Sequence, residues 1–135
     1  MKKTRVMGFG TFDGLHPGHR SFLKQLRRLG DELFVVVARD ANVTKLKGHH
    51  PDNPEQERQK ALEKTGLADR VVLGNPTHFY QCLLDHRPGV VGLGYDQRAD
   101  TAAIETILPG VKIIRLKPYR PKKYKSSLLA KQPKK

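Results

Sequence analysis

Five short apolar runs, separated by polar and helical segments, constrain the fold of this 135-residue chain most strongly. The clearest run, Glu-Leu-Phe-Val-Val-Val-Ala at residues 32–38, has the continuous β-branched and aromatic composition of a parallel strand covered on both faces. Similar runs predict strands at residues 5–9, 71–73, 90–93 and 111–116, with helices between them. Because strands alternate with helices, we predict an α/β fold: a single Rossmann-like, doubly wound domain with a five-stranded parallel sheet.

A long polar segment follows the first predicted helix and the second strand. Apolar residues at helical spacing predict that first helix over residues 19–29, closed by Gly30 as a C-terminal cap residue. After the second strand, residues 39–53 carry several lysines and histidines and are predicted to form a long polar loop. Loops of that length in compact domains are usually functional or mobile.

The next helix is predicted from its capping residues. Asn53 stands at the cap position, Pro54 at the first helical position and Gln56 where a reciprocal capping bond can form, and Gly66 ends the helix. Two shorter helices are predicted at residues 77–86 and 101–108.

The composition shifts to proline and lysine near the end of the chain. We therefore divide the chain into a domain at residues 1–117 and a basic C-terminal segment at residues 118–135. Ser126 or Ser127 can cap one or two helical turns within this segment, and the last residues are expected to be disordered.

Charge and composition narrow the classes of function. The net charge of +13 attracts polyanions, and both nucleic acids and nucleoside triphosphates qualify. Neither an interleaved aromatic set nor a zinc-ligand spacing accompanies the charge, so nucleic-acid binding is a second hypothesis. No apolar run approaches the about 20 residues of a membrane span, and we expect a cytoplasmic protein. The single cysteine, Cys82, excludes an internal disulfide and is expected to be a buried helical thiol.

Chemistry is predicted at the segment from Gly10 to His19, Gly-Thr-Phe-Asp-Gly-Leu-His-Pro-Gly-His, which joins the first strand to the first helix. Gly10 allows a close backbone approach, Pro17 and Gly18 suit the first helical turn, and free N–H groups at a helix N-terminus bind anions. His16 and His19, three residues apart, can both donate hydrogen bonds into the same turn. A phosphate fits this place.

This segment resembles the signature of the cytidylyltransferase-like nucleotidyltransferases, Gly-Thr-Phe-Asp followed closely by His-x-Gly-His. Within that superfamily the best match is to the archaeal-type FAD synthetases (FMN adenylyltransferases), and the next is to the glycerol-3-phosphate cytidylyltransferases. The resemblance covers most of the chain. It continues, in order, through Ala-Arg-Asp-Ala-Asn-Val-Thr-Lys-Leu-Lys-Gly at 38–48, Glu57-Arg58, Gly-Tyr-Asp-Gln at 94–97 and Tyr-Lys-Ser-Ser at 124–127.

The resemblance implies catalytic roles for the two histidines. His16 and His19 are implied to hold the α- and β-phosphates of a nucleoside triphosphate and to stabilise the pentacoordinate phosphorus as pyrophosphate leaves, with no covalent enzyme intermediate. Without the rest of the motif, His16 would be interpreted as a loop residue and His19 as a surface residue of the helix. A metal site is not expected, because His-Pro-Gly-His provides two ligands and no third histidine or cysteine stands at a suitable spacing.

The turn residues between the two halves of the motif have further implied roles. Family members present backbone N–H groups and the Thr hydroxyl to phosphate and nucleoside, which assigns Thr11 and Phe12 to the nucleotide site. Asp13 beside a polyanion would be repulsive, so we expect it to hold the loop or an acceptor. An Asx turn is the alternative for Asp13.

Two lysines in the predicted loop are candidates for neutralising phosphate charge. Lys45 and Lys47 would point the same way from an extended loop, toward the triphosphate or an acceptor phosphate. We place Lys45 with the catalytic histidines and Lys47 with the nucleotide-binding residues. A solvated charged loop is the alternative.

Four residues in the second half of the chain complete the predicted site. In the resembling families the Asp of the turn after the fourth strand touches the nucleotide, which assigns Asp96; an Asx turn is its alternative. Tyr124 matches a nucleotide-contacting Tyr of the FAD synthetases, and Ser126 and Ser127 stand where cytidylyltransferases carry a helix start. The C-terminal segment is thereby expected to close the nucleotide site in part.

The resemblance implies transfer of a nucleoside monophosphate from a triphosphate to a phosphate-bearing small molecule, with pyrophosphate release. The preferred reaction is ATP plus FMN giving FAD. The alternatives are CTP with glycerol 3-phosphate or a similar alcohol phosphate, and a basic nucleotide- or RNA-binding module without turnover. Mg²⁺ or another divalent cation is implied, bound chiefly through triphosphate oxygens and water. The oligomeric state is open, although related cytidylyltransferases are often dimers.

Overall fold

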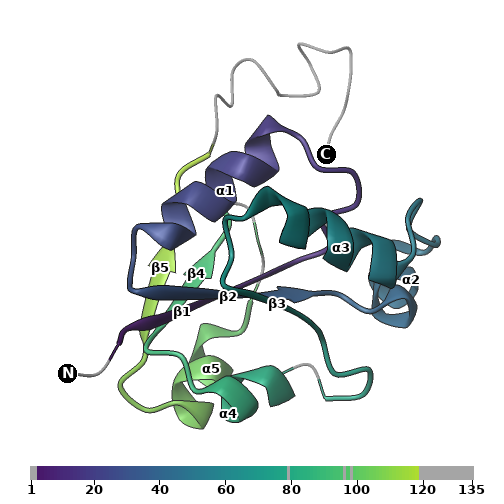
Figure 1. Cartoon of the computed structure of the whole chain (residues 1–135). Coiled ribbons are helices and arrows are strands. Elements are labelled where there is room, and N and C mark those ends of the chain that lie inside the picture. Colours follow the sequence, from purple (N-terminus) through teal and green to yellow (C-terminus); the bar gives the residue numbers. More distant parts are fainter. Residues whose placement is uncertain (1–2, 79, 96, 98, 119–135) are drawn as a thin grey trace.

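A computed structural model describes residues 3–78, 80–95, 97 and 99–118 (Figure 1). The basic C-terminal segment, apart from Pro118, lies outside these residues, as do Asp96, Tyr124, Ser126 and Ser127. The elements, in chain order, are β1 (Arg5–Gly10), α1 (Pro17–Arg27), β2 (Glu32–Val37), α2 (Asp40–Lys47), α3 (Glu55–Thr65), β3 (Arg70–Leu73), α4 (Gln81–His86), β4 (Val90–Leu93), α5 (Thr101–Ile107) and β5 (Lys112–Arg115).

The strands form one five-stranded sheet in the order β3-β2-β1-β4-β5, with every pair parallel. Helices α1 and α3 lie on one face of the sheet, and α4 and α5 lie on the other (Figure 1). The predicted α/β, doubly wound fold is confirmed. The strand order reverses between β1 and β4, and in such sheets ligands bind outside the carboxyl ends of the strands at this switch point.

Two buried layers hold the helices against the sheet. Residues of β1 and β2 alternate between the layers: Val6 packs under α1 and α3, whereas Met7 packs with α4 and α5. Helix α1 packs closely on the sheet, because a Cβ on Gly8 or on Gly92 would collide with the Leu26 side chain. These two glycines therefore let α1 lie directly over β1 and β4, with its first turn beside the carboxyl end of β1.

The end of α1 differs from the sequence prediction, whereas the end of α3 agrees with it. Helix α1 ends at Arg27 with Arg28 as a right-handed cap residue, so the prediction of Gly30 as the cap was wrong. Gly30 is instead required by a close approach, since a Cβ there would lie 2.7 Å from the Thr4 carbonyl oxygen. For α3, Gly66 does end the helix in the left-handed conformation (φ 71°), as predicted.

The predicted long loop at residues 39–53 contains helix α2, so that prediction was wrong. Gly48 ends α2 in the left-handed conformation (φ 77°), and Val43 is its only buried residue. A helix that buries one side chain shows almost no apolar stripe, which is why its sequence reads as a loop. Asn53 is not the α3 cap either, because Pro54 takes that position.

The predicted helix at 77–86 is shorter than expected and starts at Gln81. The Asn75 carboxamide oxygen accepts hydrogen bonds from the backbone N–H groups of Thr77 (3.0 Å) and His78 (2.8 Å), which forms an Asx turn in place of the first helical turns. Cys82 in α4 is buried, as predicted, and burial raises the pKa of its thiol. Within the described ranges every helix is too short to cross a bilayer.

Candidate active site

The His16 imidazole caps helix α1, which begins directly after the β1 turn. Its Nδ1 accepts hydrogen bonds from the backbone N–H groups of Gly18 (3.0 Å) and His19 (3.4 Å). A Cβ on Gly18 would lie 2.8 Å from His16 Cε1, so the cap requires glycine here. The sequence predicts free N–H groups at this turn, and for these two the prediction is wrong. Because Nδ1 accepts, neutral His16 carries its proton on Nε2, which is the donor left for a ligand.

The His19 ring stacks on the His16 ring. The centroids are 3.8 Å apart with an interplanar angle of 22°, and His19 Nδ1 is buried with no hydrogen-bond partner among the described residues. Burial lowers the pKa of His19 to about 4; His16 and the charge of Lys47 act in the same direction, and the nearby Gly14 backbone opposes them. Burial also lowers the pKa of His16. Both imidazoles are therefore neutral at pH 7 in the free protein.

Phe12 supports this pair from inside the core. Its side chain is 3% exposed, and its ring centroid lies 5.5 Å from that of His19 and 6.1 Å from that of Phe22. Phe12 has φ of 55°, a left-handed conformation that costs a non-glycine residue about 1 kcal/mol or more. A Cβ on Gly10 would lie 2.7 Å from the Phe12 ring. The motif therefore uses the Phe12 side chain for packing, while the Phe12 backbone stays in the turn.

Asp13 fastens the β1–α1 turn to the segment before α3. One carboxylate oxygen accepts from the Asp52 backbone N–H (2.7 Å), and the other accepts from the Asn53 backbone N–H (3.0 Å) and side-chain amide (2.9 Å). Burial would raise the pKa of Asp13, but these hydrogen bonds outweigh it and the pKa lies below its ordinary value. The prediction that Asp13 holds a loop is confirmed, and its partners lie far along the chain, unlike those of an Asx turn.

The two candidate lysines are on the last turn of α2, and both are exposed. In a helix, positions two residues apart differ by about 200° in direction, so Lys45 and Lys47 do not point the same way. That part of the prediction was wrong, because it assumed an extended loop. Lys47 is the one whose charge acts on His19.

The turn after β4 is fixed beside the end of β1 at the switch point. The Gln97 side-chain amide donates to the Phe9 carbonyl (3.1 Å), and its oxygen accepts from the Gly94 N–H (3.0 Å). The Arg115 guanidinium donates to the Gly94 carbonyl (2.8 Å) and to the Gln97 carbonyl. Tyr95, 55% exposed, lies in this turn next to Asp96, which is outside the described residues.

The comparison with protein families agrees with this geometry. The sequence model described as "Cytidylyltransferase-like" matches residues 7–131. The chain belongs to the cytidylyltransferase-like family.

Named relatives and a solved structure are similar to most of this cytidylyltransferase-like chain. An FAD synthase of Aciduliprofundum boonei is 47% identical over 119 residues, which cover 85% of this chain and 79% of that protein. An FAD synthase of Methanosarcina acetivorans is 46% identical over 104 residues, 76% of this chain and 66% of that protein. A crystal structure of a lipopolysaccharide core biosynthesis protein from Thermoplasma volcanium superposes with a TM-score of 0.80 at 36% identity, covering 87% of this chain and 99% of that one. The chain is a nucleotidyltransferase.

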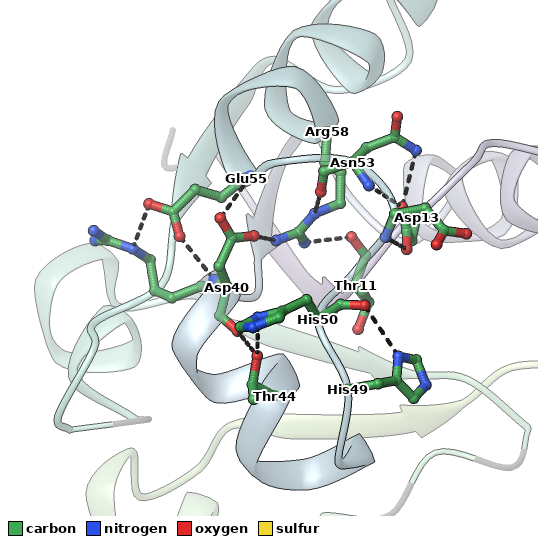
Figure 2. A network of polar contacts seen from close by, with 11 residues as sticks. Thr11, Asp13, Asp40, Thr44, His49, His50, Asn53, Glu55 and Arg58 are labelled. Atoms are coloured by element: carbon green, nitrogen blue, oxygen red, sulfur yellow. Dashed lines mark hydrogen bonds and ion pairs between the residues drawn. The ribbon is translucent and has the colours of Figure 1, made fainter.

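The sequence did not single out the polar network behind the cytidylyltransferase-like motif. Figure 2 shows Arg58 donating to the Thr11 carbonyl of the motif turn and to the Asp40 carboxylate of α2. Glu57-Arg58 is part of the family resemblance, but nothing in the sequence indicates that Arg58 is 1% exposed. Sequence patterns for helix capping involve residues a few positions apart. Glu55 pairs with Asp40, fifteen residues earlier, so such a pattern does not reveal it.

A shallow hollow of about 580 Å³ lies at the opposite edge of the sheet, by the amino ends of β1 and β2. The guanidinium of Arg5 there is already bound to Glu32 (2.8 Å) and to the His86 carbonyl (2.7 Å). The hollow is lined by Lys3, Arg5, Glu32, Asp85, His86, Arg87 and Gly89. None of the motif residues takes part in it.

Proposed function

We propose that this chain transfers AMP from ATP to FMN, with FAD and pyrophosphate as products. The observation that carries the proposal is the stacked pair His16 and His19 at the N-terminus of α1, beside the switch point of a parallel sheet. The relatives named FAD synthase support FMN as the acceptor and ATP as the donor.

The reaction needs positioning and charge more than covalent chemistry. A phosphate oxygen of FMN attacks the α-phosphorus of ATP, a new P–O bond forms, the bond to the bridging oxygen of the β-phosphate breaks, and pyrophosphate leaves. His16 Nε2–H and the His19 ring donate to the phosphate oxygens, while Thr11 and the Phe12 backbone contact the nucleotide. The anionic triphosphate raises the imidazole pKa values, so the pair gains positive charge as the transition state forms.

Helix α2 supplies the remaining positive charge at this edge. Lys47, whose charge acts on His19, would neutralise the triphosphate, and Lys45, about 200° away around the helix, is left for an acceptor phosphate. Gly10, Pro17 and Gly18 are proposed to contact the phosphates from the same turn, where Gly10 and Gly18 also leave room for the rings of Phe12 and His16.

Mg²⁺ or another divalent cation would reach the site with the triphosphate. Among the described residues there is no group of three His, Cys, Asp or Glu side chains that could hold a metal ion. The carboxylate of the motif turn, Asp13, already accepts three hydrogen bonds. These residues fit an ion that is held by phosphate oxygens and water, as is usual for Mg²⁺, whose charge would stabilise the leaving pyrophosphate.

The C-terminal segment, residues 118–135, is proposed to close the nucleotide site with Tyr124, Ser126 and Ser127, and Asp96 is proposed as a further nucleotide contact. The position of Lys117, the residue directly before this segment, supports this placement. The Gln25 side chain of α1 accepts from the Lys117 N–H (2.9 Å) and donates to its carbonyl (2.9 Å), which ties the segment to the helix that carries the histidines. A cytoplasmic location, where ATP and FMN occur together, belongs to the same proposal.

Pyrophosphate release tests the function. The purified chain is assayed with ATP or CTP, each paired with FMN, glycerol 3-phosphate or phosphocholine, in the presence of Mg²⁺. Turnover with ATP and FMN is expected. Turnover with CTP and glycerol 3-phosphate alone would replace the proposal by the cytidylyltransferase alternative. Salt-dependent binding of polyanions without turnover of any pair would leave a binding module. Size measurement in the same buffer shows whether the chain is a homodimer.

A further inference from the structure

The Arg58 side chain joins three segments that surround the proposed site. It is fully buried, although a guanidinium is always charged. Nε donates to the Asn53 carbonyl (2.9 Å), Nη1 to the Thr11 carbonyl (2.8 Å) and Nη2 to the Asp40 carboxylate (2.6 Å) (Figure 2). These acceptors belong to the segment before α3, to the motif turn and to the first turn of α2. One side chain therefore fixes all three segments relative to one another.

The N-termini of α2 and α3 are capped by each other's carboxylates. The Asp40 N–H donates to Glu55 (2.7 Å), and the Glu55 N–H donates to Asp40 (3.3 Å). Two positive helix ends that meet would repel, and the two carboxylates offset them. Arg39 completes the network with Glu55 (3.1 Å) and the Gly74 carbonyl (3.2 Å).

Polar contacts, more than apolar packing, position helix α2. Val43 is its only buried residue, so its place on the protein depends on the bonds at its first turn. The last turn of the same helix carries Lys47, whose charge acts on His19. Any loosening of the first turn thus moves Lys47 with respect to the histidine pair.

We infer that Arg58 is a positioning residue that holds the lysine-bearing helix α2 and the His16–His19 turn in one arrangement. The inference rests on the proposed function, since it concerns the same triphosphate site. The Arg58 side chain is fully buried and its N–H groups donate to the protein, so its proposed role is to position other groups. Replacing both partners of a buried ion pair by apolar residues often costs no stability, so the role we assign to this pair is the arrangement that it fixes. A guanidinium can donate in three directions at once, whereas the single ammonium of lysine cannot span these acceptors.

A double-mutant cycle tests the inference with Arg58→Lys and Lys47→Ala. Each single change is expected to raise the KM for ATP by about tenfold, because displaced binding groups lose their contacts with the triphosphate. In the Arg58→Lys background, Lys47→Ala is expected to add less than about twofold, because Lys47 is already out of place. Effects that multiply fully would overturn the inference. Lys60→Ala, on the exposed side of α3, is the matched control and should change KM in neither background.

A second readout does not depend on the enzyme's activity. The pKa of His19, measured by NMR, should rise in Lys47→Ala because a nearby positive charge is removed. In Arg58→Lys it should rise as well, with little further change when Lys47 is also removed. If the wild type releases no pyrophosphate, the proposed function fails while this titration still decides the role of Arg58. An unchanged His19 pKa in Arg58→Lys would contradict that role.

A milder variant covers the case in which Arg58→Lys does not fold. Asp40→Asn keeps the shape of the side chain but removes the charge that pairs with Arg58, and 40% of the Asp40 side chain is exposed to solvent. It should show the same non-additivity with Lys47→Ala at smaller amplitude, in the KM for ATP and in the His19 pKa. Full additivity of Asp40→Asn with Lys47→Ala would overturn the inference in that case.

Discussion

The helix N-termini at the carboxyl edge of the sheet are capped in two different ways. Helix α1 is capped locally, by His16 only two and three residues before the N–H groups it binds. Helices α2 and α3 are capped by Asp40 and Glu55, which are fifteen residues apart. The carboxylate of each accepts a hydrogen bond from the backbone N–H of the other, and we call this arrangement the crossed cap. The local cap leaves one imidazole nitrogen for a ligand, whereas the crossed cap uses its polar groups on the protein itself. The first is therefore suited to chemistry and the second to support.

The largest expected loss of stability comes from removing Arg58, which donates to Asp40 of the crossed cap. Arg58→Met leaves the Asp40 carboxylate and the Thr11 and Asn53 carbonyls without their donor. The free energy of unfolding should fall by about 3 kcal/mol, because each shielded acceptor that loses its donor costs about 1–3 kcal/mol. Urea unfolding measures the loss. Arg27→Met is the control, because its pair with Asp69 is exposed and should contribute no more than about 1 kcal/mol; equal losses in both variants would contradict the account.

The local cap can be separated from the chemistry of its histidine. His16→Ala and His19→Ala should each lower turnover by about 10²-fold or more, because the lost groups act on the transition state. His16→Ala should also lose about 1 kcal/mol of stability, which His16→Ser should restore because serine caps a helix as well. Turnover of His16→Ser should stay low. Steady-state kinetics and urea unfolding of the three variants provide the measurement, and near-wild-type turnover in any of them would refute the proposed roles.

The two caps should also respond differently to pH. The pKa of His19 is lowered to about 4 and that of His16 is also lowered, whereas an unfolded histidine titrates near 6.5. Between pH 6.5 and about 4 the unfolded chain binds more protons, so stability falls as pH falls through this window. The crossed cap is made by the carboxylates of Asp40 and Glu55, so no histidine within it titrates in this window. Urea unfolding at pH 7.5, 6 and 5 should show this loss, and His19→Asn should flatten it; an identical slope in that variant would assign the effect elsewhere.

The smallest expected effect concerns the C-terminal segment. Removing residues 131–135 should leave the kinetics nearly unchanged, because this end carries only unpatterned charge. Removing everything from Tyr124 onward should raise the KM for ATP, because Tyr124 and the Ser126-Ser127 pair are lost. The two truncated chains are compared in the pyrophosphate assay with ATP as the varied substrate. Equal kinetics would confine the site to the N-terminal motif and its lysine helix.

The same contrast explains how far the sequence could be interpreted. The run at residues 32–38 predicts a strand covered on both faces because nearly all of its residues are apolar. The His16–His19 motif could be recognised because its residues are close together in the sequence. Helix α2 escaped prediction because it buries only Val43 and is positioned by Glu55, which follows in the chain. Arg58 escaped because a buried arginine and a surface arginine look alike in sequence. Local patterns could be predicted, and contacts between distant segments could not.

Direct detection of FAD tests the central claim best. The full chain is incubated with Mg²⁺, ATP and FMN, and the flavin product is separated and quantified beside His16→Ala and His19→Ala. The account predicts stoichiometric formation of FAD and pyrophosphate by the wild type, and a loss of about 10²-fold in each variant. No FAD from the wild type, with pyrophosphate released from CTP and glycerol 3-phosphate instead, would contradict it.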